Sequence, residues 1–329
     1  MKCIKTLLVS TCLTAAACLM SMHADAQSPA PNAPTGPLRI VATSTPGSSV
    51  DVFSRAVGDR LAANLNRTVV IENRAGGGGT VAATEVLNGA TDGSVVLANS
   101  SAHVTTPYIY PKLSFDILRD LTAVVPLAVL PSVLIVPGER DWKTLADLIA
   151  AGKEKPGKLF YGTVGSGTST HMSAELLRLR AGMQAVQVPF KGSPEVLLEV
   201  ASGRIDWAIL PASTVLPQLK DGRVRAIAIS ADKRVSQLPD VPTIAEAGLA
   251  DADFPLWIGL FVSSKTPPAA VKRLHDETTR ALASPEVRER FDKLGAEPMP
   301  MSSDEFNALV LSQATKAADI VKATNMKAN

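Results

Sequence analysis

The sequence predicts an α/β protein on the basis of three observations. The chain has 329 residues, of which 46% are hydrophobic, and it contains 22 Gly and 23 Pro, which suits one or two domains with sizeable cores. Short β-branched runs alternate with segments of helical periodicity, as expected of parallel sheets flanked by helices. Small-residue loops follow several of these runs, at the strand ends where α/β proteins bind ligands.

The charge balance excludes a general nucleic-acid binder. The chain carries 33 Lys and Arg against 31 Asp and Glu, a net charge of +2, and its basic residues form no block of five or more. The apolar fraction also excludes a disordered chain, because the sequence has enough apolar surface to bury.

The N-terminus has the pattern of a secretory signal peptide over residues 1–26. Lys2 and Lys5 precede an apolar stretch over 6–22, and Ala24–Ala26 forms an A-x-A motif. We therefore expect cleavage after Ala26 and a periplasmic mature protein. A retained membrane anchor is the alternative interpretation.

The cysteines support export. Cys3, Cys12 and Cys18 all lie in the predicted leader, so the mature chain has no thiol for a disulfide or a cysteine enzyme. Lipidation of Cys12 or Cys18 is a minor alternative, since neither follows the leucine of a bacterial lipobox.

The first half of the mature chain repeats one pattern: a strand, a small-residue loop and a helix. A strand over 38–42 leads into a helix that Ser49 or Asp51 can cap. The pattern returns with strands over 68–72, 95–98 and 160–163, which precede the loops Gly76–Gly79, Asn99–His103 and Gly165–Ser169.

A buried run and several helix starts complete the expected elements. Residues 124–136 form the most apolar segment, but it is too short to span a bilayer and predicts a strand and a turn. Helix-start signals recur toward the C-terminus, so we expect roughly the last seventy residues to be mostly helical. The signals are Thr144 with Asp147, Thr266 before Pro267, Ser284 before Pro285, and Ser302 with Glu305.

The loop over 162–171 carries the strongest chemical signal. Its glycines allow close approach to the backbone, and its hydroxyls and free amides precede a predicted helix, which favours an anion such as a carboxylate or phosphate. A second loop, Thr45–Asp51, has the same architecture. A plain turn that only caps its helix is the alternative for each.

Signatures of enzymes are largely missing, so we expect no enzyme, catalytic residue, metal or cofactor. No Walker loop, G-x-S-x-G or H-E-x-x-H motif occurs. His171 and Glu175 are four residues apart and could share a metal, but an exposed helical pair is the favoured interpretation. Ser166 with His171 is a disfavoured nucleophile pair, because residues at this spacing seldom form a hydrogen bond.

Two further residues have open roles. Lys191 either faces an acidic ligand or lies in solvent, and Trp257 forms either an apolar pocket wall or part of the core.

The mature chain resembles the Bug (TctC-type) receptors, the periplasmic substrate-binding proteins of tripartite tricarboxylate transporters. The resemblance extends from Leu38 to about Lys322 and depends on motifs in a fixed order. These are Arg39–Val41, Pro46–Gly47 with Asp51, Val70–Gly76, Asp92–Gly93, Lys155–Leu159, Gly165–His171, Val188–Ser193, Leu238–Thr243, Glu246–Gly248 and Leu294–Pro298.

The resemblance implies a two-domain periplasmic binding protein of type II with its ligand cleft between the domains. Domain 1 would be 27–130 plus 254–329, and domain 2 would be 131–253. The implied ligand-binding residues come from four loops and one aromatic residue. They are Ser44, Thr45, Pro46, Gly47, Ser48, Asn99, Ser100, Ser101, Gly165, Ser166, Gly167, Thr168, Ser169, Pro211, Ala212, Ser213 and Trp257.

The implied function is a receptor for a small carboxylate, a mono-, di- or aromatic acid, that delivers it to the permease subunits of a tripartite tricarboxylate-type transporter. Two departures change the expected pocket. Ser44, Ser48 and Ser49 replace an aromatic residue and glycines, and Leu210–Pro211 replaces Asp-Asn. The alternatives are a receptor that feeds a sensor kinase and, less favoured, a periplasmic hydrolase that uses Ser166.

Overall fold

The computed structural model describes residues 36–327. The predicted signal peptide, its cleavage site and the three cysteines lie outside the described residues. Within them the strands form two sheets, one of six strands and one of five. This confirms the predicted α/β class.

The first sheet has the order β11-β4-β10-β3-β1-β2. Strand β1 pairs in parallel with β2 and β3, whereas β10 runs antiparallel to both β3 and β4. The strands are β1 (Leu38–Ala42), β2 (Val69–Asn73), β3 (Val95–Ser100), β4 (Leu121–Leu130), β10 (Leu256–Ser263) and β11 (Glu297–Pro298).

The second sheet has the order β7-β6-β8-β5-β9. Strand β6 pairs in parallel with β7 and β8, and β5 runs antiparallel to β8 and β9. The strands are β5 (Ser132–Pro137), β6 (Leu159–Thr163), β7 (Ala185–Pro189), β8 (Trp207–Pro211) and β9 (Val224–Ser230).

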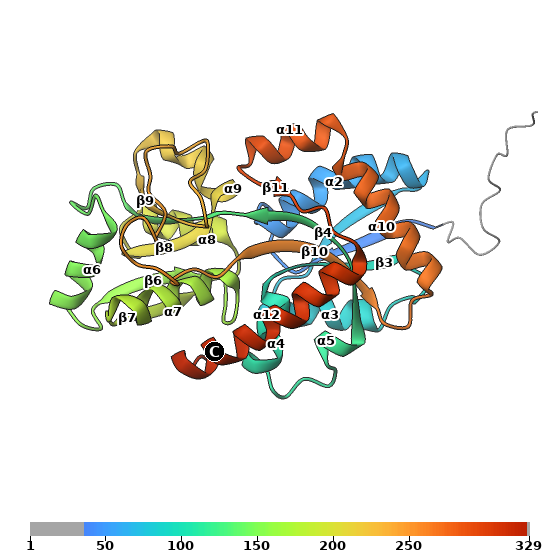
Figure 1. Cartoon of the computed structure of the whole chain (residues 1–329), viewed down its shortest axis with the longest axis horizontal. Coiled ribbons are helices and arrows are strands. Elements are labelled where there is room, and N and C mark those ends of the chain that lie inside the picture. Colours follow the sequence, from blue (N-terminus) through green and yellow to red (C-terminus); the bar gives the residue numbers. More distant parts are fainter. Residues whose placement is uncertain (1–35, 328–329) are drawn as a thin grey trace, which may run out of the picture. The chain divides into compact units, whose positions relative to one another are not determined.

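The prediction of parallel sheets is right for three strands of each sheet and wrong where the chain passes between the sheets. The apolar run 124–136 is divided by Pro131 into the end of β4, in the first sheet, and β5, in the second. The chain returns as β10, which lies beside β4 from Leu256 opposite Leu130 to Ser263 opposite Leu121 (Figure 1). A strand that returns beside the outgoing one runs in the opposite direction.

Helices join and cover the strands. They are α2 (Ser49–Leu65), α3 (Thr80–Leu87), α4 (Ala102–Ile109), α5 (Ile117–Asp120), α6 (Leu145–Glu154), α7 (Ser169–Ala181), α8 (Ser193–Ala201), α9 (Ala212–Val215), α10 (Pro268–Leu282), α11 (Pro285–Lys293) and α12 (Ser303–Thr324), with 3₁₀ turns η1 (Gly77–Gly79) and η2 (Leu216–Asp221). In the described part of the chain, no helix has both the length and the apolarity needed to cross a membrane.

Most of the predicted helix starts are confirmed. Thr144 and Ser302 each form a capping box, and the Ser284 hydroxyl accepts a hydrogen bond from the Val287 N–H. The helix predicted at Pro267 begins one residue later, at Pro268. The prediction that Asp51 or Ser49 caps α2 is wrong: Ser48 is the N-cap, and the Asp51 carboxylate accepts from the Gly47 N–H at 2.9 Å.

An apolar core lies on the first sheet where α12 packs against α4 and β4. Trp257 of β10 and Phe306 of α12 meet edge to face, with ring centroids 5.2 Å apart. Met172 and Leu176 of α7 belong to the same buried cluster. Helix α7 is therefore packed against the first sheet's core, although it follows a strand of the second.

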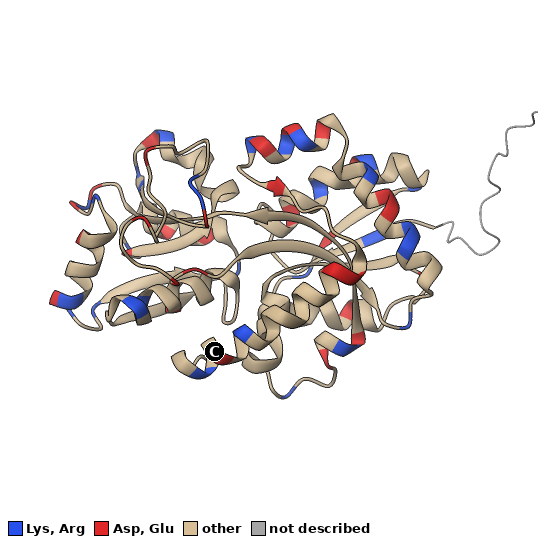
Figure 2. Ribbon diagram, viewed as in Figure 1, with Lys and Arg blue, Asp and Glu red and all other residues tan. Residues whose placement is uncertain are grey.

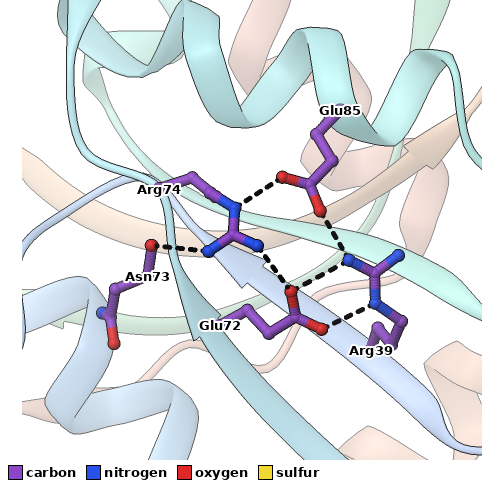
Figure 3. Close-up of polar contacts among 5 residues, drawn as sticks. All are labelled: Arg39, Glu72, Asn73, Arg74 and Glu85. Carbon is purple, nitrogen blue, oxygen red and sulfur yellow. Dashed lines mark hydrogen bonds and ion pairs between the residues drawn. The ribbon is translucent and has the colours of Figure 1, made fainter.

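An ion-pair network holds both ends of the segment that joins β2 to α3 (Figure 3). Arg39 Nε lies 2.6 Å from a carboxylate oxygen of Glu72, and Arg74 Nε lies 2.8 Å from one of Glu85. Arg39 also pairs with Glu85. The hydrogen bonds to both glutamates raise the pKa of Arg39, and the Arg39 guanidinium lowers the pKa of Glu72. The glycine loop 76–79 is thus anchored before and after its turn.

Elsewhere, charges of both signs are interspersed on the helices, while β4 and β10 carry none (Figure 2).

Candidate functional site

A cavity of about 310 Å³ lies at the carboxyl ends of strands from both sheets. Most of its lining residues follow β1, β2, β6 and β7 or end β3 and β8, while Tyr110 ends α4 and Leu256 begins β10. The lining residues are Thr43, Ser44, Ser48, Ser49, Val50, Gly76, Gly77, Gly78, Gly79, Asn99, Ser100, Ala102, Tyr110, Val164, Gly165, Ser166, Thr168, Ser169, Thr170, Pro189, Phe190, Lys191, Gly192, Ser193, Pro211 and Leu256.

Five helices of eight or more residues begin at this cavity, and the four-residue α9 follows its N-cap Pro211 there. The N-terminal residues of α2, α3, α4, α7 and α8, or the N-caps before them, are among its lining residues. In four of the five, all except α7, the N-cap residue makes no side-chain hydrogen bond to the first turn, whereas α6, α11 and α12, which begin away from the cavity, are capped by their own Ser or Thr. Uncapped first-turn amides and the positive helix ends favour an anion.

Hydroxyl groups make up much of the polar surface. Several already have partners within the site: Thr43 Oγ1 donates to Asn99 Oδ1 at 3.1 Å, and the Thr168 and Thr170 hydroxyls are 3.0 Å apart. The Oγ atoms of Ser44 and Ser166 are buried and have no hydrogen-bond partner among the described residues. A buried hydroxyl without a partner is costly, so these two are free to bind a polar group in the cavity.

The charge at the cavity is positive. Lys191 is the one charged side chain in the lining set given above, and neither Asp nor Glu is in that set. The Lys191 side chain is exposed, so it lies at the rim. An anionic ligand would therefore meet no like charge in the lining.

Asn99 is held by a buried histidine. Its Nδ2 lies 3.4 Å from Nδ1 of His103, whose ring stacks on Phe261 with centroids 4.0 Å apart. Burial lowers the pKa of His103 to about 3, so its ring is neutral at neutral pH. The side-chain oxygen of Asn99, Oδ1, also accepts a hydrogen bond from the Ser100 N–H at 2.8 Å. These contacts fix the side-chain amide of Asn99 at the carboxyl end of β3.

His171 and Glu175 do not form the exposed helical pair favoured from the sequence; they are only 3% and 5% exposed. Glu175 accepts hydrogen bonds from Tyr161 and Arg178. Burial raises the pKa of Glu175, but these donors lower it by more, so its net pKa is below the ordinary value. Over residues 36–327, no group of three or more His, Cys, Asp or Glu side chains could hold a metal.

Nine of the residues expected from the sequence meet at the cavity: Ser44, Ser48, Asn99, Ser100, Gly165, Ser166, Thr168, Ser169 and Pro211. The other eight are outside its lining: Thr45, Pro46, Gly47, Ser101, Gly167, Ala212, Ser213 and Trp257.

Four of these eight residues are outside the lining for local reasons. Gly47 and Ser213 line a separate groove beside α8. Gly167 faces away, because its N–H donates to His171 and its carbonyl accepts from Thr105. Trp257 is 1% exposed, and its Nε1–H donates to Gln313 at 2.6 Å. It is therefore a core residue, the second of the two interpretations open from the sequence.

Three parts of the lining were not expected. The loop Gly76–Gly79 follows β2 in the same strand, loop and helix pattern, so that pattern could have identified it. Phe190–Ser193 follows β7, and Lys191 alone of this segment was considered. Tyr110, the C-cap of α4, carries no sequence signal; burial raises its pKa.

Residues 53–326 match the protein family described as the tripartite tricarboxylate transporter family receptor. The UPF0065 protein in the tcbD-tcbE intergenic region of Pseudomonas sp. (strain P51) is 36% identical over 263 residues, which cover 80% of this chain and 78% of that one. Protein BugT of Bordetella pertussis is 29% identical over 296 residues, which cover 89% and 91%.

Two solved structures have a similar fold. The R. palustris protein Rpa4515 with adipate has a TM-score of 0.85 at 29% identity and covers 89% of this chain and 98% of its own. MatC from Rhodopseudomonas palustris with bound malate has a TM-score of 0.83 at 29% identity and covers 88% and 99%.

The two-sheet α/β fold with a cavity at its strand ends is that of a periplasmic binding protein, a class of solute-binding proteins. Within this class, the chain belongs to the receptor family of the tripartite tricarboxylate transporters.

Proposed function

We propose that this protein is an extracytoplasmic receptor that binds a small carboxylate in the cavity at the strand ends. The observation that carries the proposal is the convergence of five helix N-termini on a cavity whose lining includes neither Asp nor Glu. First-turn amides and positive helix ends stabilise an anion, and such a lining carries no charge that opposes one.

The ligand is best matched by an acid with acceptor groups at both ends. Uncapped helices α2, α3 and α4 supply amides from the side of the first sheet, and α8 supplies them from the second. The unpaired hydroxyls of Ser44 and Ser166 are divided in the same way. Relatives solved with adipate and with malate support a small dicarboxylate.

We further propose that the sheets mark two domains, 27–130 plus 254–329 and 131–253, that close on the ligand. The family supports a periplasmic location and delivery to the permease subunits of a tripartite tricarboxylate-type transporter. Cleavage after Ala26 stays a prediction from the sequence. Capture of those subunits by the ligand-loaded protein from detergent-solubilised membranes tests the delivery step. Capture of a sensor kinase in their place would favour the signalling alternative.

The geometry argues against a hydrolase. A serine nucleophile needs a base within hydrogen-bond reach, but the Ser166 hydroxyl has no partner among the described residues, and His171 Nδ1 already accepts from Gly167.

Thermal-shift screening of residues 27–329 tests the proposal. The panel comprises mono-, di-, tri- and aromatic carboxylates, amino acids, amines and neutral sugars. We expect a concentration-dependent rise in Tm with a carboxylate, since a ligand at a hundredfold excess over its Kd stabilises the native state by about 2.7 kcal/mol. A response to sugars or amines alone contradicts the proposal.

A further inference from the structure

Two loops from opposite sheets touch beside the cavity. One joins β1 to α2 and contains Thr45 and Ser48; the other joins β7 to α8 and contains Gly192. A Cβ atom at Gly192 would lie 1.9 Å from the Thr45 Oγ1 and 2.8 Å from the Ser48 Oγ. The Thr45 and Ser48 hydroxyls are themselves 3.1 Å apart. The Gly192 backbone therefore rests directly against this hydroxyl pair.

The local backbone does not require a glycine at this position. Gly192 has φ −161° and ψ 159°, an extended conformation that any residue adopts. It is also the N-cap of α8, where Ser, Asn or Asp is at least as favourable. The contact with Thr45 remains as the structural reason why a side chain at residue 192 is disfavoured: a Cβ there requires the Thr45 and Ser48 side chains to shift.

The other side of the cavity is packed more extensively. There the Thr105 hydroxyl donates to the Gly167 carbonyl, and a Cβ at Gly167 would lie 2.8 Å from Ile109. The neighbouring helix α7 inserts Met172 into the first sheet's core. At Gly192 the contact between the two loops lies near the surface, since the neighbouring Pro46 and Lys191 are exposed. The Gly192 side is therefore the part of the rim that can separate with the smaller loss of packing.

We infer that Gly192 is a positioning residue of the binding site, whose contact with Thr45 closes the cavity. This inference rests on the proposed function. A methyl group at residue 192 holds the two loops apart, so the closed arrangement, which brings the donors of both sheets onto one ligand, becomes less favourable. Overpacking of this kind costs about 1–3 kcal/mol, which corresponds to a loss of roughly 5- to 150-fold in affinity.

Titration calorimetry with malate and adipate as probes tests the inference on residues 27–329. Gly192→Ala and Gly192→Ser are each expected to weaken binding. Thr45→Ala alone is the reference for the double variant, since it removes the Thr45 hydroxyl from the contact and leaves Gly192 in place. Combined with Gly192→Ala, it removes the clashing hydroxyl and restores most of the affinity. Gly36→Ala is the matched control, because a Cβ there meets nothing within 4 Å.

Three outcomes of this titration would overturn the inference. The first is a Gly192→Ala variant with unchanged affinity. The second is wild-type affinity in Gly192→Ser, which would assign the effect to helix capping. The third is an affinity of the double variant Thr45→Ala with Gly192→Ala that stays as low as that of Gly192→Ala. Urea unfolding of each variant checks that the fold is retained.

A second measurement needs no ligand. Gly47→Cys with Pro194→Cys places thiols across the same contact, where a Cβ at Gly47 lies 3.7 Å from Pro194 Cγ, and residues 27–329 contain no other cysteine. Disulfide formation under oxidant is expected in the chain that keeps Gly192 and is expected to be slower when Gly192→Ala is added. Equal rates contradict the closure contact, whereas a slowed cross-link with no binding of any carboxylate would contradict only the proposed function.

Discussion

The Nδ1 atom of His171 accepts a hydrogen bond from the backbone N–H of Gly167 at 3.1 Å. This bond turns the Gly167 amide away from the cavity and sets the path of the loop that carries Ser166. An imidazole accepts at Nδ1 only when that nitrogen is unprotonated. Burial lowers the pKa of His171 to about 4, so the bond persists throughout the neutral range.

The lowered pKa makes the stability of the fold depend on pH. In the unfolded chain His171 gains a proton near its ordinary pKa of about 6.5, whereas in the folded chain it does so only near pH 4. The free energy of unfolding is therefore fully retained above pH 6.5 and falls as the pH drops, by about 1.4 kcal/mol per pH unit for each such histidine. His103, with a pKa of about 3, contributes in the same direction.

Urea unfolding at pH 7.5, 6.5 and 5.5 checks this dependence. His171→Gln is expected to reduce the loss of stability between pH 6.5 and 5.5 by about half, since His103 remains. His275→Gln serves as the control, because His275 is only partly buried. A slope that His171→Gln leaves unchanged contradicts the assignment.

Ser166→Ala separates stability from binding. The Ser166 hydroxyl is buried without a partner among the described residues, so its loss is not expected to lower the free energy of unfolding of the unliganded protein. The same variant is expected to lower carboxylate affinity by about 10- to 150-fold, since a hydrogen bond to a charged group contributes about 1.5–3 kcal/mol. Calorimetry measures the affinity and urea unfolding the stability.

The control for this pair of measurements is Ser213→Ala. Within residues 36–327 its hydroxyl is also buried without a partner, but it is not in the cavity lining. Equal affinity losses in both variants would remove the case for Ser166 as a ligand contact.

Trp257→Phe tests whether this residue acts through the core alone. The substitution removes the hydrogen bond to Gln313 and part of the packing on Phe306. We expect the free energy of unfolding to fall by about 1–3 kcal/mol with carboxylate affinity unchanged. A loss of affinity without a loss of stability would make Trp257 a pocket wall after all.

Glu85→Gln tests the network that anchors the glycine loop. Glu85 pairs with Arg39 and Arg74 while 28% exposed, so the stability loss is expected to be modest, about 0.5–1 kcal/mol, and smaller in high salt. Because Gly76–Gly79 lines the cavity, a loss of affinity should accompany it. Glu289→Gln, which breaks the exposed pair with Lys293, is the control, and an equal effect there would argue against loop anchoring.

Local signals predicted the class of the fold and much of the cavity. Capping by Thr144, Ser284 and Ser302 depends on residues within three positions of each other, so the sequence alone reveals it. The loop after β6 was identified because its glycines and hydroxyls are contiguous. The antiparallel direction of β10 was not predicted, because it depends on the chain returning beside β4, more than a hundred residues earlier.

Side-chain direction was the other limit. Gly167 lies between two cavity residues, yet its amide is turned outward by His171, and the sequence does not show this bond. His171 and Glu175 were expected on an exposed face because charged or polar residues at helical spacing usually are. Their helix packs against the first sheet's core, and the Glu175 carboxylate accepts a hydrogen bond from Tyr161 on a different element; the sequence shows neither contact.

The most direct test of the central claim is to place a charge in the cavity. Ser166→Asp adds one carboxylate to a set of lining residues that includes neither Asp nor Glu, and Ser166→Asn is the matched neutral variant of nearly the same size. Titration with the acid that raises Tm most is expected to show binding abolished by Ser166→Asp and largely retained by Ser166→Asn, since an unpaired like charge in a buried site is costly. Equal binding by the two variants would contradict an anion receptor whose ligand occupies this cavity.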